Sequence, residues 1–420
     1  MKVGIIGSGG REHALCSAFK KGTNVEKIYC IPGNAGTGLI ATNVNLKIED
    51  FEQIKKFVID KKIDLVVVGP EKPLVDGLVD YLEENNIEVF GPTKIASQLE
   101  GSKIFTKNLC KKYNIPSADF GVFEQMDLAK KFIRTSKYPL VVKADGLAAG
   151  KGVYICENIE QANSAVEEIF GGKFGTSNKV LIEEFLKGDE MSFFIISDGK
   201  SIKKFGTAQD HKRLEEGDNG PNTGGMGAYS PSRFENEELD KKILTKIIYP
   251  TLEALKDLNT SFKGFLYAGL MIVDNEPFLI EYNVRMGDPE CQTILPRLKT
   301  DFSEIMLAVI EKKLAYQKIE WDNKKTLSIV LCSNGYPYQY KNNVEIKNLE
   351  KVLLEENEFI FHAGTKLINS NIYSNGGRVL NVVIKSENFK KCQSIALDLL
   401  KKINWTGGFY RKDIGFKVIK

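Results

Sequence analysis

Short apolar runs alternate with amphipathic segments along the first 100 residues of the chain. Four of these runs are rich in branched aliphatic side chains, as buried strands are, and they lie at 3–6, 27–31, 65–68 and 89–90. The segments between them predict helices at 11–20, 51–61 and 74–85. Because strands that alternate with helices form parallel sheets, this pattern predicts a doubly wound α/β domain over residues 1–103.

The pattern changes beyond residue 103. A compact α/β segment is expected at about 120–190, with strands at 140–143, 152–155 and 180–183. Longer apolar runs then predict an antiparallel sheet with strands at 191–196, 266–273 and 278–284 and a helix at 239–255. A small α+β unit follows, with strands at 328–331 and 378–384 and a helix at 389–403. We therefore expect three domains, over 1–103, 104–310 and 326–420, and a small subdomain at about 120–190 within the second.

The run 279–285 carries the most informative polar pattern. Read as a strand, its period of two places Glu281, Asn283 and Arg285 on one face. Ile280, Tyr282 and Val284 then point into a core. Carboxylate and amide oxygens suit Mg²⁺, and a guanidinium can hold a phosphoryl oxygen with two donors. The run predicts an ATP–metal site, and a surface strand with ordinary charges is the alternative.

A second motif, KADGLAAGKG, spans residues 143–152. Lys143 closes an apolar strand, so its charged tip can reach a phosphate. The small residues that follow, with Gly146, Gly150 and Gly152 among them, can fold over nucleotide phosphates. It is not a Walker A motif, because neither serine nor threonine follows Lys151. A hairpin without function is the alternative.

Two glycine-rich turns follow the first two strands. The first, at 7–12, resembles a dinucleotide fingerprint, but Glu12 stands where the third glycine is needed for close helix–strand packing. No acid follows the second strand to hold a ribose hydroxyl, so NAD binding is not expected. Backbone amides in this turn and in the loop 33–37 can still bind an anion. They indicate a site for a phosphorylated small molecule, unless both are merely tight turns.

The segment at 183–190 ends one strand and begins the next. Its backbone N–H and C=O groups could hydrogen-bond the edge of an adenine, and a carboxylate beside it could accept ribose hydroxyls. Acidic residues are common in such hinges between strands, so this segment alone is a weak indication. The residues concerned are Glu183, Glu184, Phe185, Leu186 and Glu190.

A long polar loop covers residues 209–227 and begins QDHKR. Loops of this length inside compact domains are usually functional or disordered. Its charges suit anionic, amine-bearing reactants, and a solvated charge run is the alternative. His211 could be a general base, although a lone histidine is thin evidence.

Composition excludes several classes of protein. A net charge of +3 over 420 residues gives no basic field of the kind that nucleic-acid binders show. Seven scattered cysteines without a CxxC pair argue against disulfides and zinc and for a reducing compartment. No apolar run has the length of a membrane span, and the N-terminus lacks a signal-peptide core. A cytoplasmic protein without membrane or nucleic-acid partners is expected.

With these motifs in view, the chain resembles the phosphoribosylamine–glycine ligase (glycinamide ribonucleotide synthetase) family of the ATP-grasp superfamily. The likeness runs almost from end to end. It includes VVVGPEKPL at 66–74, LEGSKIFT at 99–106, FHAGTK at 361–366 and RKDIG at 411–415. The block QDHKRLEEGDNGPNTGGMGAYSP at 209–231 is long and specific to the family, whereas the glycine loop is common among ATP-grasp enzymes.

The resemblance implies a central ATP-grasp fold of two subdomains and an ATP-dependent ligase. Similar enzymes pass the γ-phosphoryl of ATP to glycine, and the amine of 5-phospho-D-ribosylamine attacks the glycyl phosphate. The products are glycinamide ribonucleotide, ADP and phosphate, in de novo purine (IMP) biosynthesis. The resemblance also implies Mg²⁺ or Mn²⁺, a monomer and a single activity. A sister ATP-grasp ligase or carboxylase, and a protein that only senses ATP, are the alternatives.

The family's residue roles carry over by motif. Those at the ATP phosphates are Lys103, Lys143 and Lys151, with residues 146–152 as the lid. Those at adenosine are Glu183, Glu184, Phe185, Leu186 and Glu190. The metal ligands are Glu281 and Asn283, and the catalytic residues are Arg285, Asp210 and Lys143. The glycine and sugar-phosphate side has Asp210, Lys212, Arg213 and Asn222. The phosphoribosylamine pocket has Gly9, Gly10, Arg11, Asn34, Gly36, Thr37 and Glu71.

The chain departs from the wider superfamily at one position. Many ATP-grasp enzymes carry a second metal-binding acid on the strand before the Glu-x-Asn pair, but residues 267–271 offer none. The metal would need more water or phosphate ligands, or a carboxylate from elsewhere in the chain.

Overall fold

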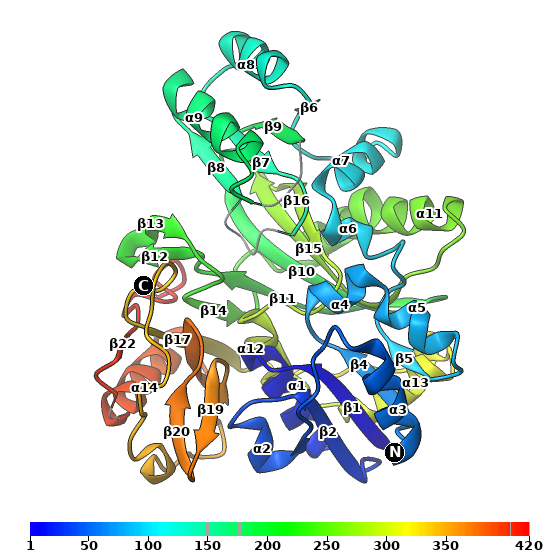
Figure 1. Cartoon of the computed structure of the whole chain (residues 1–420), viewed down its shortest axis with the longest axis vertical. Coiled ribbons are helices and arrows are strands. Elements are labelled where there is room, and N and C mark those ends of the chain that lie inside the picture. The colour runs from blue at the N-terminus through cyan, green and yellow to red at the C-terminus, as the bar shows by residue number, and fades with distance from the viewer. Residues whose placement is uncertain (148–151, 175–178, 404, 420) are drawn as a thin grey trace.

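The computed structural model describes residues 1–147, 152–174, 179–403 and 405–419 of the chain (Figure 1). Its N-terminal sheet is parallel, with strands in the order β3 (Thr42–Asn43), β2 (Lys27–Pro32), β1 (Lys2–Gly7), β4 (Leu65–Val68) and β5 (Val89–Phe90). Ile6 of β1 packs with Ile54 of helix α3 (Phe51–Lys61), whereas its neighbour Ile5 packs with Leu15 of α1 (Gly10–Lys20). Helices therefore cover both faces, which confirms the expected doubly wound α/β fold.

The helix expected at 74–85 is two helices, α4 (Glu71–Asp76) and α5 (Leu78–Glu83). Gly77 separates them because it takes the left-handed conformation, with φ 97°, which glycine adopts without steric cost. Helix α2 (Thr37–Ile40) and strand β3 were not expected, since elements this short show no periodicity.

A four-stranded antiparallel sheet forms the small subdomain, drawn at the top of Figure 1. Its order is β6 (Phe120–Phe123), β9 (Val180–Glu184), β7 (Leu140–Ala144) and β8 (Val153–Cys156). Helices α8 (Met126–Thr135) and α9 (Ile159–Phe170) pack on it through their apolar stripes, with Ile133 and Val166 buried among the strand residues.

The largest sheet has nine antiparallel strands. Its central part is β16 (Glu276–Asn283), β15 (Lys263–Val273), β10 (Asp189–Asp198), β11 (Ile202–Asp210) and β14 (Gly227–Ser230). The order then continues into β17 (Lys325–Ser333), β21 (Arg378–Ser386) and β18 (Glu358–His362), and β22 (Gly408–Phe409) pairs with β17. The strands expected near 328–331 and 378–384 thus extend the central sheet, because β14 pairs with β17.

Helices surround these sheets. Helix α10 (Glu237–Ile243) continues through a π-helical turn into α11 (Tyr249–Asp257), which matches the helix expected at 239–255. The others are α6 (Gln98–Gly101), α7 (Lys103–Lys112), α12 (Glu290–Ile294), α13 (Phe302–Ile310) and α14 (Phe389–Lys402). Two hairpins, β12 (Arg213–Glu215) with β13 (Asn219–Asn222) and β19 (Thr365–Ile368) with β20 (Asn371–Ser374), complete the described elements named here.

Two apolar clusters join the N-terminal sheet to the large sheet. Ile6 and Leu99 belong to the same buried cluster as Phe193 and Leu266, and Ile5 belongs with Phe265 in the other. A shared core holds the two sheets at a fixed relative position, and the polar ends of their strands meet above it.

The seven cysteines are all buried and free, in agreement with the expected lack of a disulfide framework. Over the part of the chain that the structure describes, no helix is both long enough and apolar enough to cross a bilayer.

Candidate active site

One large cleft lies where the N-terminal sheet, the small subdomain and the large sheet meet. Its volume is about 1220 Å³, which exceeds the 300–1,000 Å³ typical of a pocket for one small ligand. The wall combines the turn after β1, the ends of β7 and β9, and the ends of β11 and β16. The cleft therefore has room for several reactants side by side.

Strand β16 supplies Glu281 and Asn283, and both line the cleft. A β-bulge interrupts the strand, because Gly269 pairs with Glu281 while the next residue, Leu270, pairs with Leu279. Ile280, expected in the core, is therefore only half-buried and lines the cleft, since the bulge breaks strict alternation. Tyr282 and Val284 are buried as expected.

Cations surround the carboxylate of Glu281. Burial works to raise its pKa, but Lys212, Lys143, Lys103 and Arg285 together hold that pKa below its ordinary value. The described residues contain no cluster of three His, Cys, Asp or Glu side chains suited to a metal ion. Glu281 and Asn283 could still hold Mg²⁺, which takes most of its ligands from phosphates and water.

Arg285 lies just beyond β16, between two carboxylates. Its Nη2 is 2.7 Å from Oε1 of Glu100 and its Nε is 3.4 Å from Oε2 of Glu71. The second oxygen of Glu100 accepts the Val284 backbone N–H at 2.8 Å. Arg285 holds the pKa of Glu71 below its ordinary value, which fits an ionised partner. Sequence reasoning did not single out Glu100, although it lies within the motif at 99–106.

Three lysines converge beside the small subdomain. Lys143 Nζ is 2.8 Å and Lys107 Nζ is 3.5 Å from the carboxylate of Glu183. The side chains of Lys107, Lys143 and Glu183 are buried. Lys103 Nζ donates to the carbonyl of Gly146 at 2.9 Å. Burial lowers the pKa of Lys103 and of Lys107. Lys107 was missed, although its position one helical turn after Lys103 on α7 could have indicated it.

The remaining residues of the glycine loop are only partly described. Gly146 lines the cleft, and the carbonyl of Gly152 accepts the Ala144 N–H at 2.8 Å. Gly150 and Lys151 lie outside the described residues.

The residues expected at adenosine all line the cleft: Glu183, Glu184, Phe185, Leu186 and Glu190. Their surroundings differ, because Glu183 lies between two lysines whereas Glu190 Oε2 is 2.8 Å from Lys212 Nζ. Apolar side chains of Val141, Met271 and Leu279 also line the cleft, as a purine ring would require.

The polar loop after β11 contributes Asp210, Lys212, Arg213 and Asn222 to the cleft. Lys212 Nζ also lies 3.7 Å from Glu281 Oε1. Within the described residues, Oδ1 of Asp210 is buried without a hydrogen-bond partner. Burial and the nearby carboxylate of Glu290 raise the pKa of Asp210 well above its ordinary value. A buried oxygen of this kind is an acceptor that a ligand can satisfy.

Two further cleft residues, Arg378 and Glu290, were given no role from the sequence. Arg378, at the start of β21, donates to the carbonyls of Gly224 and Asp288, the latter at 2.6 Å. Glu290, at the start of α12, accepts the hydroxyl of Ser192 at 3.2 Å. Arg378 belongs to no motif, and only the fold brings it to the cleft.

The first glycine turn places Gly9 and Arg11 at the cleft, and Glu71, the first residue of α4, also lines it. Glu12 is buried, pairs with Arg11 Nε at 2.6 Å and accepts the Gly9 N–H at 2.6 Å. A Cβ on Gly69 would lie only 2.0 Å from Glu12 Oε1, so this carboxylate fills the space between two strand ends. That geometry fits the expectation that the turn does not serve NAD.

The second glycine loop lies elsewhere. Its residues Asn34, Gly36 and Thr37 are not among the cleft-lining residues of the described chain. Gly10, from the first turn, is not among them either. Asn34 Oδ1 accepts the N–H groups of Gly36 and Thr37 at 2.9 Å, and its Nδ2 donates to the carbonyl of His362 at 2.8 Å. The loop is closed on itself and on β18. Residues 45–49, which sequence reasoning missed, line the cleft on this side instead.

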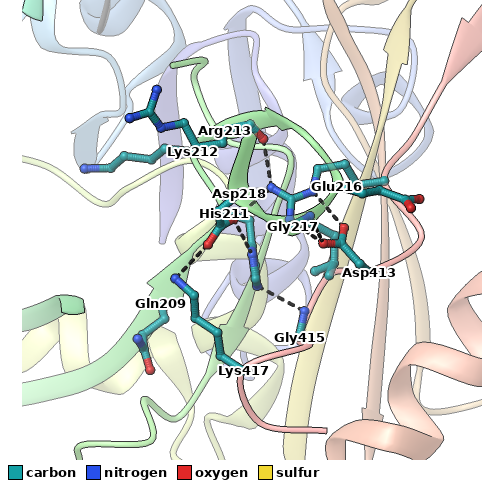
Figure 2. Close-up of polar contacts among 12 residues, drawn as sticks. Gln209, His211, Lys212, Arg213, Glu216, Gly217, Asp218, Asp413, Gly415 and Lys417 are labelled. Atoms are coloured by element: carbon teal, nitrogen blue, oxygen red, sulfur yellow. Dashed lines mark hydrogen bonds and ion pairs between the residues drawn. The ribbon is translucent and has the colours of Figure 1, made fainter. Parts of the chain in front are cut away.

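Both ring nitrogens of His211 have partners within the protein (Figure 2). Its Nε2 accepts the Gly415 N–H at 3.0 Å, so Nδ1 carries the proton and faces Asp218 Oδ1 at 3.3 Å. Burial lowers the pKa of the imidazole. Since both nitrogens have partners, His211 is placed as a structural residue rather than as a general base.

Comparison with known proteins matches most of the chain to one family. Family models for the N, ATP-grasp (A) and C domains of phosphoribosylglycinamide synthetase match residues 1–100, 101–291 and 326–417. Phosphoribosylamine–glycine ligase of Brucella melitensis is 45% identical over the whole chain and 99% of its own length, and that of Mesorhizobium japonicum is 46% identical.

Solved structures match the fold of nearly the whole chain. The crystal structure of phosphoribosylamine–glycine ligase from Thermotoga maritima has a TM-score of 0.85 at 34% identity, and the match covers 99% of this chain and 100% of that one. The biotin carboxylase domain of Hydrogenobacter thermophilus 2-oxoglutarate carboxylase has a TM-score of 0.73 at 15% identity, covering 97% of this chain and 91% of that one, which shows a shared fold.

Proposed function

The chain belongs to the phosphoribosylglycinamide synthetase family, and we propose that it catalyses the ATP-dependent ligation of glycine to 5-phosphoribosylamine in purine biosynthesis. The observation that carries this proposal is the unbroken match, at 45% identity, to a ligase of that name over the whole chain. The cleft supports it, since Lys103 and Lys143, the oxygens of Glu281 and Asn283, and the carboxyl group of Asp210 line one space.

We assign the ATP end of the cleft to Lys103, Lys143, Glu183 and the backbone at Phe185 and Leu186, with Lys151 and the loop 146–152 above the phosphates. Glu281 and Asn283 would hold Mg²⁺ or Mn²⁺, since an ionised carboxylate and an amide oxygen fit such a cation. The bound cation would offset negative charge on the phosphates. Lys212 Nζ lies 3.7 Å from the same carboxylate.

Phosphoryl transfer to glycine would turn a poor acyl donor into an acyl phosphate. Arg285, held by Glu71 and Glu100, would stabilise charge on the phosphoryl group during transfer. The amine of phosphoribosylamine would then attack the acyl carbon, with phosphate leaving. Asp210 would accept a hydrogen bond from an amino group, because its buried Oδ1 lacks a partner in the described chain.

The amine substrate would lie on the N-terminal side of the cleft. Gly9, Arg11 and Glu71 line that side, and Lys212, Arg213 and Asn222 face them from the loop after β11. We propose that a monomer is the active form. Sedimentation of the purified protein tests that proposal, and a dimer whose dissociation removes activity would contradict it.

An ADP-release assay tests the reaction. Protein with Mg²⁺-ATP, glycine and phosphoribosylamine generated in place should release ADP and phosphate, and omission of either substrate should stop it. Glu281→Ala should abolish turnover, since the cation would lose its only charged ligand on β16. ADP release that continued at full rate without the amine would indicate an ATPase. A requirement for another carboxylate in place of glycine would indicate a sister ligase.

A further inference from the structure

Residues 411–417, close to the end of the described chain, lie against the hairpin loop 213–218 (Figure 2). We call these seven residues the C-terminal clamp. Arg411 Nη1 donates to the carbonyl of Arg213 at 2.9 Å and to Asp218 Oδ1 at 3.0 Å. The clamp therefore contacts the backbone one residue after Lys212, which lines the cleft.

Arg411 is buried and hydrogen-bonded within this contact. Its side chain is only 2% exposed, and Nε and Nη2 donate to the two oxygens of Asp413 at 2.8 and 2.7 Å. The fork geometry of a guanidinium fixes its orientation, which lysine cannot reproduce. Asp413 also accepts the Gly217 N–H at 2.7 Å, so the pair holds both ends of the hairpin turn.

The charges of the cluster balance. Lys417 Nζ is 2.7 Å from Asp218 Oδ2, so Asp218 and Asp413 face Arg411 and Lys417. Nearby cations hold the pKa of Asp413 below its ordinary value. Arg411 is the buried member of this network, and removing its carboxylate partners would leave a buried charge unpaired.

His211 connects the C-terminal clamp to the cleft residues Asp210 and Lys212. It lies between Asp210 and Lys212 on one backbone segment, and those two residues both line the cleft. The Gly415 N–H donates to His211 Nε2 at 3.0 Å, and the Gly227 carbonyl accepts the His211 N–H at 2.8 Å. Holding the imidazole thus holds the backbone that carries Asp210 and Lys212.

We propose that the C-terminal clamp is a positioning element for Asp210 and Lys212, with Arg411 and His211 as its positioning residues. The proposal rests on the proposed ligase function only for its kinetic consequences. Lys103 and Lys143 have partners of their own, Gly146 and Glu183, so their contacts with ATP should not depend on the clamp. Among the described residues, Lys212 reaches the ATP side only through Glu190 and Glu281, so the effect on nucleotide binding should be small. Loss of the clamp should instead impair the use of glycine and the amine.

Four variants and one matched control test this. Arg411→Met and His211→Leu should lower kcat/KM for glycine on the order of 10²-fold, as small misplacements of reacting groups do. The Kd for ADP should stay within about twofold of wild type, as expected for a site with separate partners. Arg411→Lys should recover little, whereas His211→Gln should recover most activity because its Oε1 can accept the Gly415 N–H. Arg297→Met removes another buried arginine, bonded to Ser230 and Lys324 outside the cleft, and should leave kcat/KM for glycine unchanged.

Amide hydrogen exchange provides a readout that does not depend on activity. Residues 209–223 should exchange faster in Arg411→Met and His211→Leu, and at the wild-type rate in Arg297→Met. Unchanged kinetics or unchanged exchange in the two clamp variants would overturn the proposal, as would an equal kinetic loss in Arg297→Met. If wild type released no ADP with glycine and the amine, the proposed function would fail, while the exchange data would still decide whether the clamp orders this loop.

Discussion

Several charged side chains in the cleft lie in pairs and triads. Arg285 is shared by Glu71 and Glu100, and Glu183 is shared by Lys107 and Lys143. Buried charges require such partners, because transfer of an unpaired charge from water is costly. Each pairing therefore has a measurable consequence when one partner is removed.

Arg285→Lys should lower kcat by roughly 10²-fold and leave the Kd for ATP nearly unchanged. A lysine keeps the charge but not the fork that can contact Glu100 and a phosphoryl oxygen together. Steady-state kinetics and calorimetry check this, with the exposed Arg134→Lys on α8 as the control. An unchanged kcat with a raised KM for ATP would mean that Arg285 contacts only the ground state.

Glu183→Ala should destabilise the protein by about 3–5 kcal/mol, because two buried lysines lose their carboxylate. Its neighbour Glu184 is exposed, so Glu184→Ala should change the free energy of unfolding by no more than about 0.5 kcal/mol. Urea unfolding of both variants decides the matter. Equal stability of the two would show that Lys107 and Lys143 do not need Glu183.

At the scale of elements, strand ends and helix faces place the reactive groups. Helix α7 presents Lys103 and Lys107 on one face because they are four residues apart, and β16 presents Glu281 and Asn283 because they are two apart. The bulge at Ile280 keeps Glu281 in register with Gly269 while β16 continues past it. The glycine loop follows β7 and precedes β8 in the chain.

The role of residues 146–152 as a lid is a prediction, and 148–151 of them lie outside the described residues. Amide exchange over 146–152 should slow when Mg²⁺-ATP binds, since phosphates would provide partners for its N–H groups. Exchange in helix α9, on the far side of the small sheet, serves as an internal reference. Equal protection of the loop with and without ATP would contradict a lid.

At the scale of the whole molecule, the histidines mark contacts between distant parts of the chain. The chain has three, and all are buried. His13 of α1 accepts the N–H of His362 of β18 at 2.9 Å, which joins the first domain to the last strands. Burial lowers the pKa of His13 to about 3, with His362 adding to the effect, and lowers the pKa of His362 to about 4.

These shifts predict acid instability. Because the folded-state pKa values lie below the ordinary 6.5, the fold stabilises neutral imidazole. That contribution is complete above pH 6.5 and is lost as the pH falls toward about 4. For His362 alone the loss is roughly 3 kcal/mol. Urea unfolding from pH 8 to 4 checks it. His362→Asn should flatten this dependence, since its amide can reach Thr365 without titrating; an unaltered pH profile in that variant would exclude His362 as the source.

The sequence alone determined the features that local spacing encodes. Period-two and helical patterns gave nearly all strands and helices of the N-terminal sheet, and placed Glu281, Asn283 and Arg285 at one site. Glu12, which stands where a dinucleotide turn needs glycine, was also visible in the sequence, and its side chain fills the space beside Gly69. Periodicity suffices here because a residue's face in a helix or strand depends on its near neighbours.

Only the tertiary structure decided which distant residues share the cleft. It joined β14 to β17, directed the loop at Asn34 away from the cleft, and brought in Lys107, Glu290 and Arg378. It also set Arg411 against Arg213, about 200 residues earlier in the chain. Such contacts follow from how whole sheets pack on a shared core, and no local pattern in the sequence records the packing partner of a face.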